Sequence, residues 1–277
     1  MSERTSYTEG TPNWIDLGTP DLEAATRFYG DLFGWTFHNA GEEAGNYTMC
    51  LHDGQPIGAI APQRDPSDPA RWSTYFASDD VDRTAARITE AGGSLLMDPM
   101  DVFDQGRMLY AEDPAGARFG VWQGKAHPGA RLVNEPGSFI WNELHTRDGA
   151  TEDAFYTSVF GYDREQVGDG QTFDYSLYKV GEALIGGRNQ LGEDDSTPAG
   201  WLTYFAVEDP DATVAAVTAA SGSVLTEPRD SEYGRMAVVA DPWGAVFAVI
   251  APPTEAGDST AADSAAGDTA PEAGATP

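Results

Sequence analysis

Residues 14–35 read WIDLGTPDLEAATRFYGDLFGW, and residues 141–162 read WNELHTRDGATEDAFYTSVFGY. Aligned without a gap, the two stretches share Trp, Leu, Thr, Asp, Phe, Tyr, Phe and Gly at matching places. The repetition extends over two further pairs of segments, 71–82 with 200–211 and 106–122 with 234–250. A duplication of this length predicts two domains of one fold in a single chain.

Each half is itself built from a repeated unit. Residues 14–19 are typical of a short strand, and the apolar positions of 22–32 follow helical spacing. Asp21 is the expected N-cap of that helix, and Gly34 is the expected stop. Three short strand candidates follow, and the same order restarts at Trp72. Each domain is therefore predicted as βαβββ followed by βαβββ.

Composition marks the limits of the two domains. The segments between and outside them are rich in Gly, Pro or acidic residues and poor in large apolar ones. The predicted division is a flexible leader at 1–10, a first domain at 11–123, a linker at 124–137, a second domain at 138–251 and a disordered acidic tail at 252–277.

The charge balance excludes several classes of partner. The chain carries 45 acidic residues against 16 Lys and Arg, a net charge of -29, which argues against a nucleic acid or an anionic membrane as partner. The single cysteine, Cys50, permits no disulfide within the chain. The polar residues 1–10 lack the apolar segment of a secretory signal, so a cytoplasmic protein is expected.

These motifs resemble one known superfamily. The D-L-x-x-A-x-x-F-Y helix at 21–29, the L-F-G-W exit at 32–35 and the D-P-x-G-x-x-F strand at 113–119 are similar to the vicinal oxygen chelate superfamily. It includes glyoxalase I, extradiol dioxygenases and bleomycin-resistance proteins. More narrowly, the chain resembles actinobacterial tandem glyoxalase-like proteins often labelled "hydroxylase". The resemblance implies an α+β fold of two tandem glyoxalase-like domains, each a pair of βαβββ modules forming a cup-shaped mixed sheet with helices outside.

The resemblance also implies a divalent metal on the wall of each cup. The usual ligands are a His or Gln early in the first strand, a His in the strand that opens the second module, and a Glu in the last strand. Those places fall at Trp14, Ser73 and Gly120 in the first domain and at Trp141, Leu202 and Ala248 in the second. Trp, Gly, Ala and Leu side chains cannot coordinate a metal, and Ser is a poor ligand. We therefore expect no metal and no other cofactor.

Strand alternation suggests what lines the cups instead. If Trp14 points inward, Asp16 does too, and the same parity in the second domain selects Trp141, Glu143 and His145. Asp16, Glu143 and His145 are candidates for acid–base catalysis or for orienting a ligand. The alternative for the two carboxylates is an ion pair with an arginine of the repeated Gly-Arg-Met. The residues expected to contact a ligand are Trp14, Tyr75, Arg107, Trp122, Trp141, Tyr204 and Arg235. His127, in the linker, is expected to be solvated.

An aromatic cup with one carboxylate suits a flat organic molecule. The favoured hypothesis is a metal-independent binding protein for a small aromatic or polycyclic molecule, acting in resistance or sequestration as a monomer or homodimer. One alternative is a metal-independent isomerase, cyclase or lyase with a cup carboxylate as base. Another is a glyoxalase- or dioxygenase-type metalloenzyme with displaced ligands such as Glu143 and His145.

Overall fold

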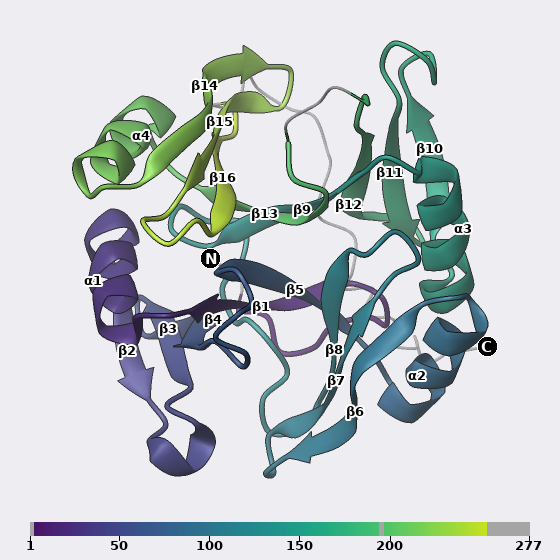
Figure 1. Ribbon diagram of the computed structural model, residues 1–277, viewed down its shortest axis with the longest axis horizontal. Coiled ribbons are helices and arrows are strands. Elements are labelled where there is room, and N and C mark those ends of the chain that lie inside the picture. Colours follow the sequence, from purple (N-terminus) through teal and green to yellow (C-terminus); the bar gives the residue numbers. More distant parts are fainter. Residues whose placement is uncertain (1–2, 194–196, 254–277) are drawn as a thin grey trace, which may run out of the picture.

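The computed structural model describes residues 3–193 and 197–253 (Figure 1). The first domain contains β1 (Pro12–Thr19), α1 (Leu22–Phe33), β2 (Thr36–Asn39), the 3-10 turn η1 (Glu42–Ala44), β3 (Thr48–His52), β4 (Gln55–Pro62), β5 (Arg71–Ala77), α2 (Val81–Glu90), β6 (Ser94–Val102), β7 (Gly106–Glu112) and β8 (Arg118–Gly124). The second contains β9 (Phe139–Thr146), α3 (Gly149–Phe160), β10 (Asp163–Val167), β11 (Tyr175–Val180), β12 (Ala183–Gln190), β13 (Gly200–Ala206), α4 (Pro210–Ala219), β14 (Ser223–Ser231), β15 (Gly234–Ala240) and β16 (Val246–Ala251).

Each domain forms one sheet of eight strands. The strand order is β2-β3-β4-β1-β5-β8-β7-β6 in the first domain and β10-β11-β12-β9-β13-β16-β15-β14 in the second. The first strands of the two modules, β1 and β5, pair antiparallel at the centre, with Trp14 opposite Tyr75. The predicted α+β architecture of two tandem mixed sheets is therefore confirmed, and both modules of a sheet come from the same domain.

The helix ends follow the local sequence. Asp21 has extended backbone and its side chain accepts a hydrogen bond from the amide of Ala24, at 3.0 Å, which satisfies one of the free amides of the first turn. Gly34 ends α1 at a φ of 72°, a conformation that favours glycine. Asp148 and Gly161 do the same for α3. Both the start and the stop predicted for the first helix are confirmed.

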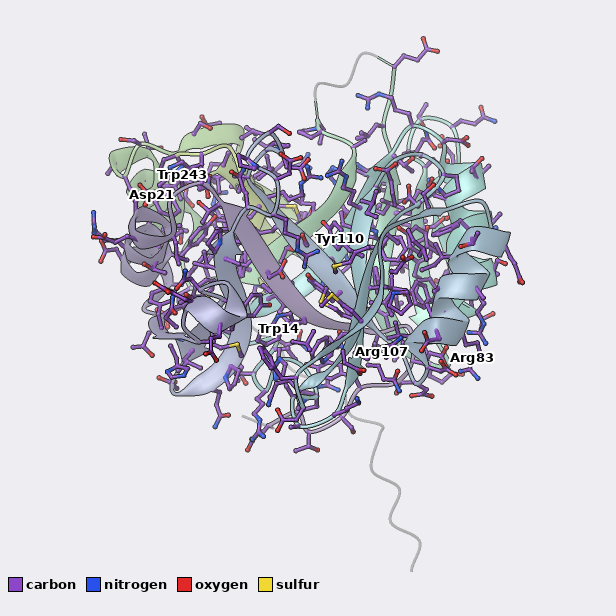
Figure 2. The ribbon with its side chains drawn as sticks, turned by 60° about the horizontal axis from the view of Figure 1, so that its bottom comes forward. Trp14, Asp21, Arg83, Arg107, Tyr110 and Trp243 are labelled. Atoms are coloured by element: carbon purple, nitrogen blue, oxygen red, sulfur yellow. The ribbon has the colours of Figure 1, made fainter. Side chains whose placement is uncertain are left out.

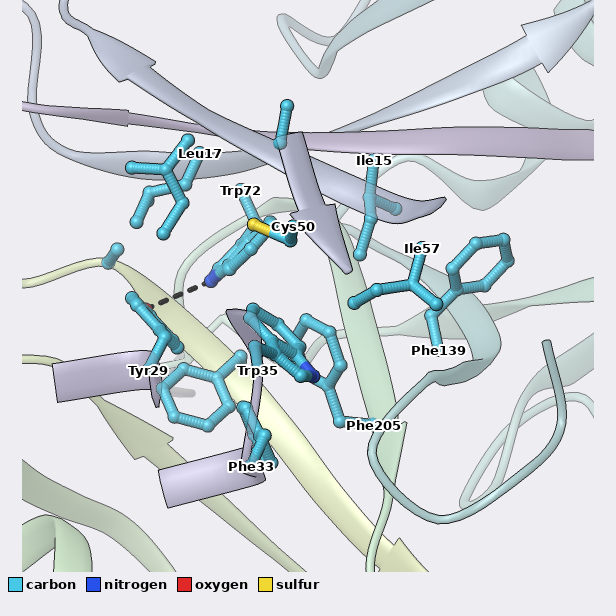
Figure 3. Close-up of a cluster of buried hydrophobic side chains, with 14 of the residues drawn as sticks. Ile15, Leu17, Tyr29, Phe33, Trp35, Cys50, Ile57, Trp72, Phe139 and Phe205 are labelled. Carbon is cyan, nitrogen blue, oxygen red and sulfur yellow. Dashed lines mark hydrogen bonds between the residues drawn. The ribbon is translucent and has the colours of Figure 1, made fainter. Parts of the chain in front are cut away.

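The two sheets pack back to back. Figure 1 shows α1 beside α4 and α2 beside α3, with β5 and β13 between the two pairs. The helix-side face of the first sheet shares one apolar core with the second domain, in which Phe33, Trp35 and Trp72 meet Phe205 (Figure 3). Because the helix-side faces are buried against each other, the concave faces of the two sheets point away from each other.

The segments outside the domains are less regular. Residues 3–10, predicted as a leader, run beside the linker, where the Tyr7 hydroxyl donates to the carbonyl of Ala130 at 2.6 Å. Most of the predicted tail, from residue 254 onward, lies outside the described residues. Among the helices that the structure describes, none is both long enough and apolar enough to span a bilayer.

Candidate functional site

A buried carboxylate lies at the centre of the first cup. Asp16 stands on the central strand β1 and is 9% exposed. Its Oδ2 accepts hydrogen bonds from the Tyr75 hydroxyl at 2.8 Å and the Tyr47 hydroxyl at 3.3 Å. The indole nitrogen of Trp14 donates to the Tyr47 oxygen at 2.8 Å. Strand alternation on β1 and β5 brings Trp14, Asp16 and Tyr75 to the same concave face.

The second cup repeats this cluster. Oε2 of Glu143 accepts from the Tyr175 hydroxyl at 2.8 Å, and Oε1 accepts from the Tyr204 hydroxyl at 3.1 Å. Trp141 donates to the Tyr175 oxygen at 3.2 Å. His145 adds a contact that the first cup lacks, because its Nε2 lies 2.5 Å from Oε1 of Glu143. A tryptophan, an acid and two tyrosines thus form one hydrogen-bonded cluster in each domain.

Burial sets the protonation of the first cluster. It raises the pKa of Asp16, although Arg64 and the hydrogen bonds from Tyr75 and Tyr47 oppose that rise. Burial and the charge of Asp16 raise the pKa of both tyrosines well above the ordinary value. The tyrosines therefore remain hydrogen-bond donors at neutral pH, and the carboxylate is an easier proton acceptor than a solvated one.

The repeated arginines lie elsewhere. Arg107 donates to Asp82 at the start of α2, with both nitrogen–oxygen distances 2.9 Å, and Arg235 donates to Asp211 on α4 at 2.8 Å. Neither pairs with a cup carboxylate. The reason is strand parity: Tyr110, which lines the first cavity, has the opposite parity to Arg107 on β7, and Figure 2 shows the two apart. Neither arginine is placed to contact a ligand in a cup.

Two predicted ligand contacts fill one end of the first cup. Trp14 and Trp122 are both buried, and the ring of His127 packs edge-on against Trp14 at 4.4 Å between centroids. Trp122 donates to the His127 carbonyl oxygen at 2.8 Å. His127 was expected in solvent, but burial and the nearby Arg131 lower its pKa to about 4. The linker histidine and the two indoles thus close this end of the cup.

A cavity of about 300 Å³ occupies the other end. Its lining includes the predicted residues Asp16 and Tyr75, together with Tyr47, Tyr110 and Arg64. The Tyr110 hydroxyl lies 3.0 Å from the Ser73 oxygen, and the Arg64 guanidinium lies 5.2 Å from the centre of the Tyr110 ring. Neither Tyr47 nor Tyr110 is among the residues that the sequence predicts as ligand contacts. Arg64 carries no local signal, because it lies in the loop between β4 and β5.

The residues at the family's metal-ligand positions do not fit a metal ion. These positions hold Trp14, Ser73 and Gly120, and a Cβ atom added at Gly120 would approach the Tyr75 ring to 2.1 Å. A glutamate there would require Tyr75, and with it Asp16, to rearrange. Within the described parts of the chain, no group of three or more His, Cys, Asp or Glu residues could hold a metal ion.

Comparison with known proteins supports the fold and its duplication. The profile of the Glyoxalase/Bleomycin resistance protein/Dioxygenase superfamily matches residues 11–121 and again 143–249. CFP32 of Mycobacterium bovis, named as a candidate glyoxylase, is 41% identical over 91% of this chain and 98% of its own. The anthracycline biosynthesis protein DnrV of Streptomyces peucetius is 38% identical over 89% of this chain and 94% of its own.

Solved structures show the same fold at low sequence identity. The Mn(II)-bound glyoxalase from Novosphingobium aromaticivorans superposes with a TM-score of 0.61 at 17% identity, covering 91% of this chain and 83% of its own. The 2,3-dioxygenase LapB from Pseudomonas sp. KL28 gives a TM-score of 0.61 at 14% identity, covering 88% and 93%. At these identities, the likeness concerns the architecture and not the chemistry of the cups.

Proposed function

Because the chain belongs to the Glyoxalase/Bleomycin resistance protein/Dioxygenase superfamily, we propose that it binds a small aromatic molecule in the first cup, without the family's metal. One observation carries the proposal: the first cup holds a cavity of about 300 Å³ with tyrosine walls and Asp16 in its lining. This volume is at the lower end of the range for small-molecule sites. It suits one to three fused rings rather than a polymer.

The chemistry of the walls supports this choice. Tyr47, Tyr75 and Tyr110 offer aromatic surface to a flat ligand, and such surface favours offset or edge-on ring contacts. Asp16 can accept a further hydrogen bond from a ligand hydroxyl. DnrV, a relative named for anthracycline biosynthesis, gives independent support for an aromatic ligand. Sequestration of such a compound in the cytoplasm, by a monomer or homodimer, is part of this proposal.

The second cup is proposed as a related but less polar site. Leu202 and Tyr204 pack with partly buried Trp141, Met236 and Val238, and Glu143 and His145 supply its polar end. Because its carboxylate cluster matches the first, we propose Trp141 and Tyr204 as ligand contacts there as well.

Equilibrium binding tests the proposal. We would titrate 2-naphthol and 1,2-dihydroxyanthraquinone into the full chain and follow heat by calorimetry. Asp16→Asn and Tyr110→Ala should weaken binding, while Arg107→Gln, which changes an arginine outside the cup, should not. No saturable heat with either probe, or equal affinity for all variants, would contradict binding in the first cup.

A second candidate function is acid–base catalysis by Asp16. The observation that favours it is a carboxyl group of raised pKa in the lining of a cavity, an arrangement common in active sites. Asp16 would remove a proton next to a carbonyl group, and Tyr47 or Tyr75 would steady the developing negative charge. The test is deuterium exchange at C1 of 2-tetralone, followed by NMR. Exchange that the wild type accelerates and Asp16→Asn loses, with binding retained, would favour an enzyme.

A further inference from the structure

Three arginines line the first cavity of a strongly acidic chain. Arg64, Arg71 and Arg118 contribute to the wall, against the acids Asp16 and Asp68. The whole chain has a net charge of -29, so a cavity wall with three arginines is unusually rich in positive side chains for this molecule. An arginine in a low-dielectric cavity wall attracts an anionic group of a ligand.

Ion pairs occupy two of these three arginines. Arg118 lies 3.0 Å from Asp68 and 3.3 Å from Glu112, and Arg71 lies 3.7 Å from the same oxygen of Asp68. Arg64 forms no ion pair within the described residues; its guanidinium instead lies over the Tyr110 ring. Arg64 is exposed. Its charge acts on Asp16 without an ion pair at contact distance, so it can also turn to an incoming anion.

The second domain shows that the fold does not need these arginines. Strand register makes Arg71 equivalent to Gly200 and Arg118 equivalent to Val246. The register of β4 and β12, continued beyond the strand ends, makes Arg64 equivalent to Gly192. Two further wall positions also carry less polar side chains in the second domain, where Leu202 replaces Ser73 and Val238 replaces Tyr110. The sheet has the same strand order in both domains, so these three arginines are specific to the first cavity and the fold does not require them.

We infer that the first cup selects aromatic acids, which carry a hydroxyl at one end and a carboxylate at the other. This inference rests on the proposed function and names its ligand class. Asp16 repels an anion, so the hydroxyl end points inward and donates to Asp16. The carboxylate end then reaches Arg64 and Arg118, where a charge-assisted hydrogen bond is stronger than a neutral one. The second cup has no arginine at these three positions. Its nearby arginine, Arg229, acts on Tyr204 from β14 instead, so a carboxylate placed as in the first cup has no equivalent partner there.

A matched pair of ligands isolates the charge. We would compare 6-hydroxy-2-naphthoate with its methyl ester by calorimetry, using the full chain at low salt. The acid should bind about tenfold tighter or more, since a charge-assisted contact replaces a neutral one. Arg64→Gln should bring the ratio of the two affinities toward one, because it weakens binding of the acid more than binding of the ester. Arg118→Val, the residue of the second cup, should do the same.

The controls separate charge from folding and from the proposed function. Arg107→Gln removes one positive charge from the same domain outside the cup and should keep the ratio. Arg64→Gln breaks no ion pair, so it reports on charge even if Arg118→Val unfolds the chain. Ester binding equal to or tighter than acid binding, or a ratio unchanged in Arg64→Gln, would overturn this inference while aromatic binding stands. Binding of neither probe would overturn both.

Discussion

The hydroxyl of Tyr29 on α1 donates to Asp241 of the other domain, with 3.0 Å between the oxygens. In the reciprocal contact, the hydroxyl of Tyr156 on α3 donates to Asp113 of the first domain, with 2.9 Å between the oxygens. Each tyrosine also accepts from a tryptophan of its own domain, Trp72 or Trp201. The F-Y and D-P-x-G motifs that reveal the family are therefore the residues that join the two halves.

Removing one of these hydroxyls should destabilise the chain. Tyr156→Phe removes one hydrogen bond from buried Asp113 and leaves the indole N–H of Trp201 without a partner, at a cost of about 1–3 kcal/mol. Urea unfolding followed by tryptophan fluorescence measures the change. Tyr233→Phe is the matched control, because Tyr233 is 53% exposed and should change stability by less than about 0.5 kcal/mol. Equal effects of the two changes would contradict a specific role for the bond.

Glu152 should make stability depend on pH. It is fully buried at the interface, and burial, together with Asp113, raises its pKa to about 9 from 4.5. Between pH 4.5 and pH 9, Glu152 therefore keeps its proton in the folded chain and loses it in the unfolded chain. Stability from this group is complete below pH 4.5 and falls as pH rises toward 9, by at most about 1.4 kcal/mol per pH unit.

Glu152→Gln tests this dependence. The amide has the shape of the protonated acid and does not titrate, so its melting temperature should fall less than that of the wild type between pH 5 and pH 9. Glu152→Ala copies Ala25, the residue at this place in α1, and should also flatten the curve. Parallel curves for wild type and both variants would show that Glu152 does not carry the effect.

The metal question has a direct measurement. The places of the family's ligands hold side chains that cannot coordinate a metal or, at Ser73, coordinate it poorly. We therefore expect near-zero occupancy after exposure to Zn²⁺, Ni²⁺, Mn²⁺ and Fe²⁺ and removal of free ion. Mass spectrometry of the metal content checks it. About one tightly held ion per chain would contradict the expectation. Its loss in Glu143→Gln or His145→Ala would then place it in the second cup.

A buried ion pair distinguishes the second domain from the first. Arg188 lies 2.9 Å from Asp153 and 2.9 Å from Asp174, and it is almost fully buried. The first domain holds Ile60 and Thr26 in place of Arg188 and Asp153. Arg188→Ile alone should cost about 1.5–3 kcal/mol, because buried Asp153 loses one of its two arginines and keeps Arg164 and the Tyr178 hydroxyl as partners.

The double change Arg188→Ile with Asp153→Thr installs the pair of the first domain. It should recover part of the loss, since no buried charge is left without its partner. Thermal unfolding of the three chains gives the comparison. A double variant less stable than Arg188→Ile would mean that the buried carboxylate is not the source of the cost.

Local sequence information predicts the architecture well. The duplication, the helix caps and the strand alternation depend on neighbours along the chain, and they place Asp16, Glu143, Tyr75 and Tyr204 on the concave faces. Alternation also places Arg107 on the opposite face from Met108, so its distance from the cup follows from the same rule. Strand alternation therefore predicts that Arg107 points away from the cup, but it does not predict the ion pair with Asp82.

The rest of the site depends on contacts between distant segments. Tyr47 precedes β3, which β4 separates from β1 in the sheet, so its bond to Asp16 has no local signature. Arg64 comes from an irregular loop, and His127 comes from the linker. Tertiary packing alone brings these residues to the cup, and periodicity cannot predict loop positions of this kind.

The fusion of two like domains has a consequence for how such a site can change. In a symmetric dimer of identical chains, every substitution appears in both cups at once. Here the halves share their fold and their reciprocal tyrosine bonds, but each cup is encoded separately. One cup can therefore gain Arg64 and Arg118 while the other keeps Gly192 and Val246. The covalent link lets a single gene encode two unlike cups on two sheets of the same topology.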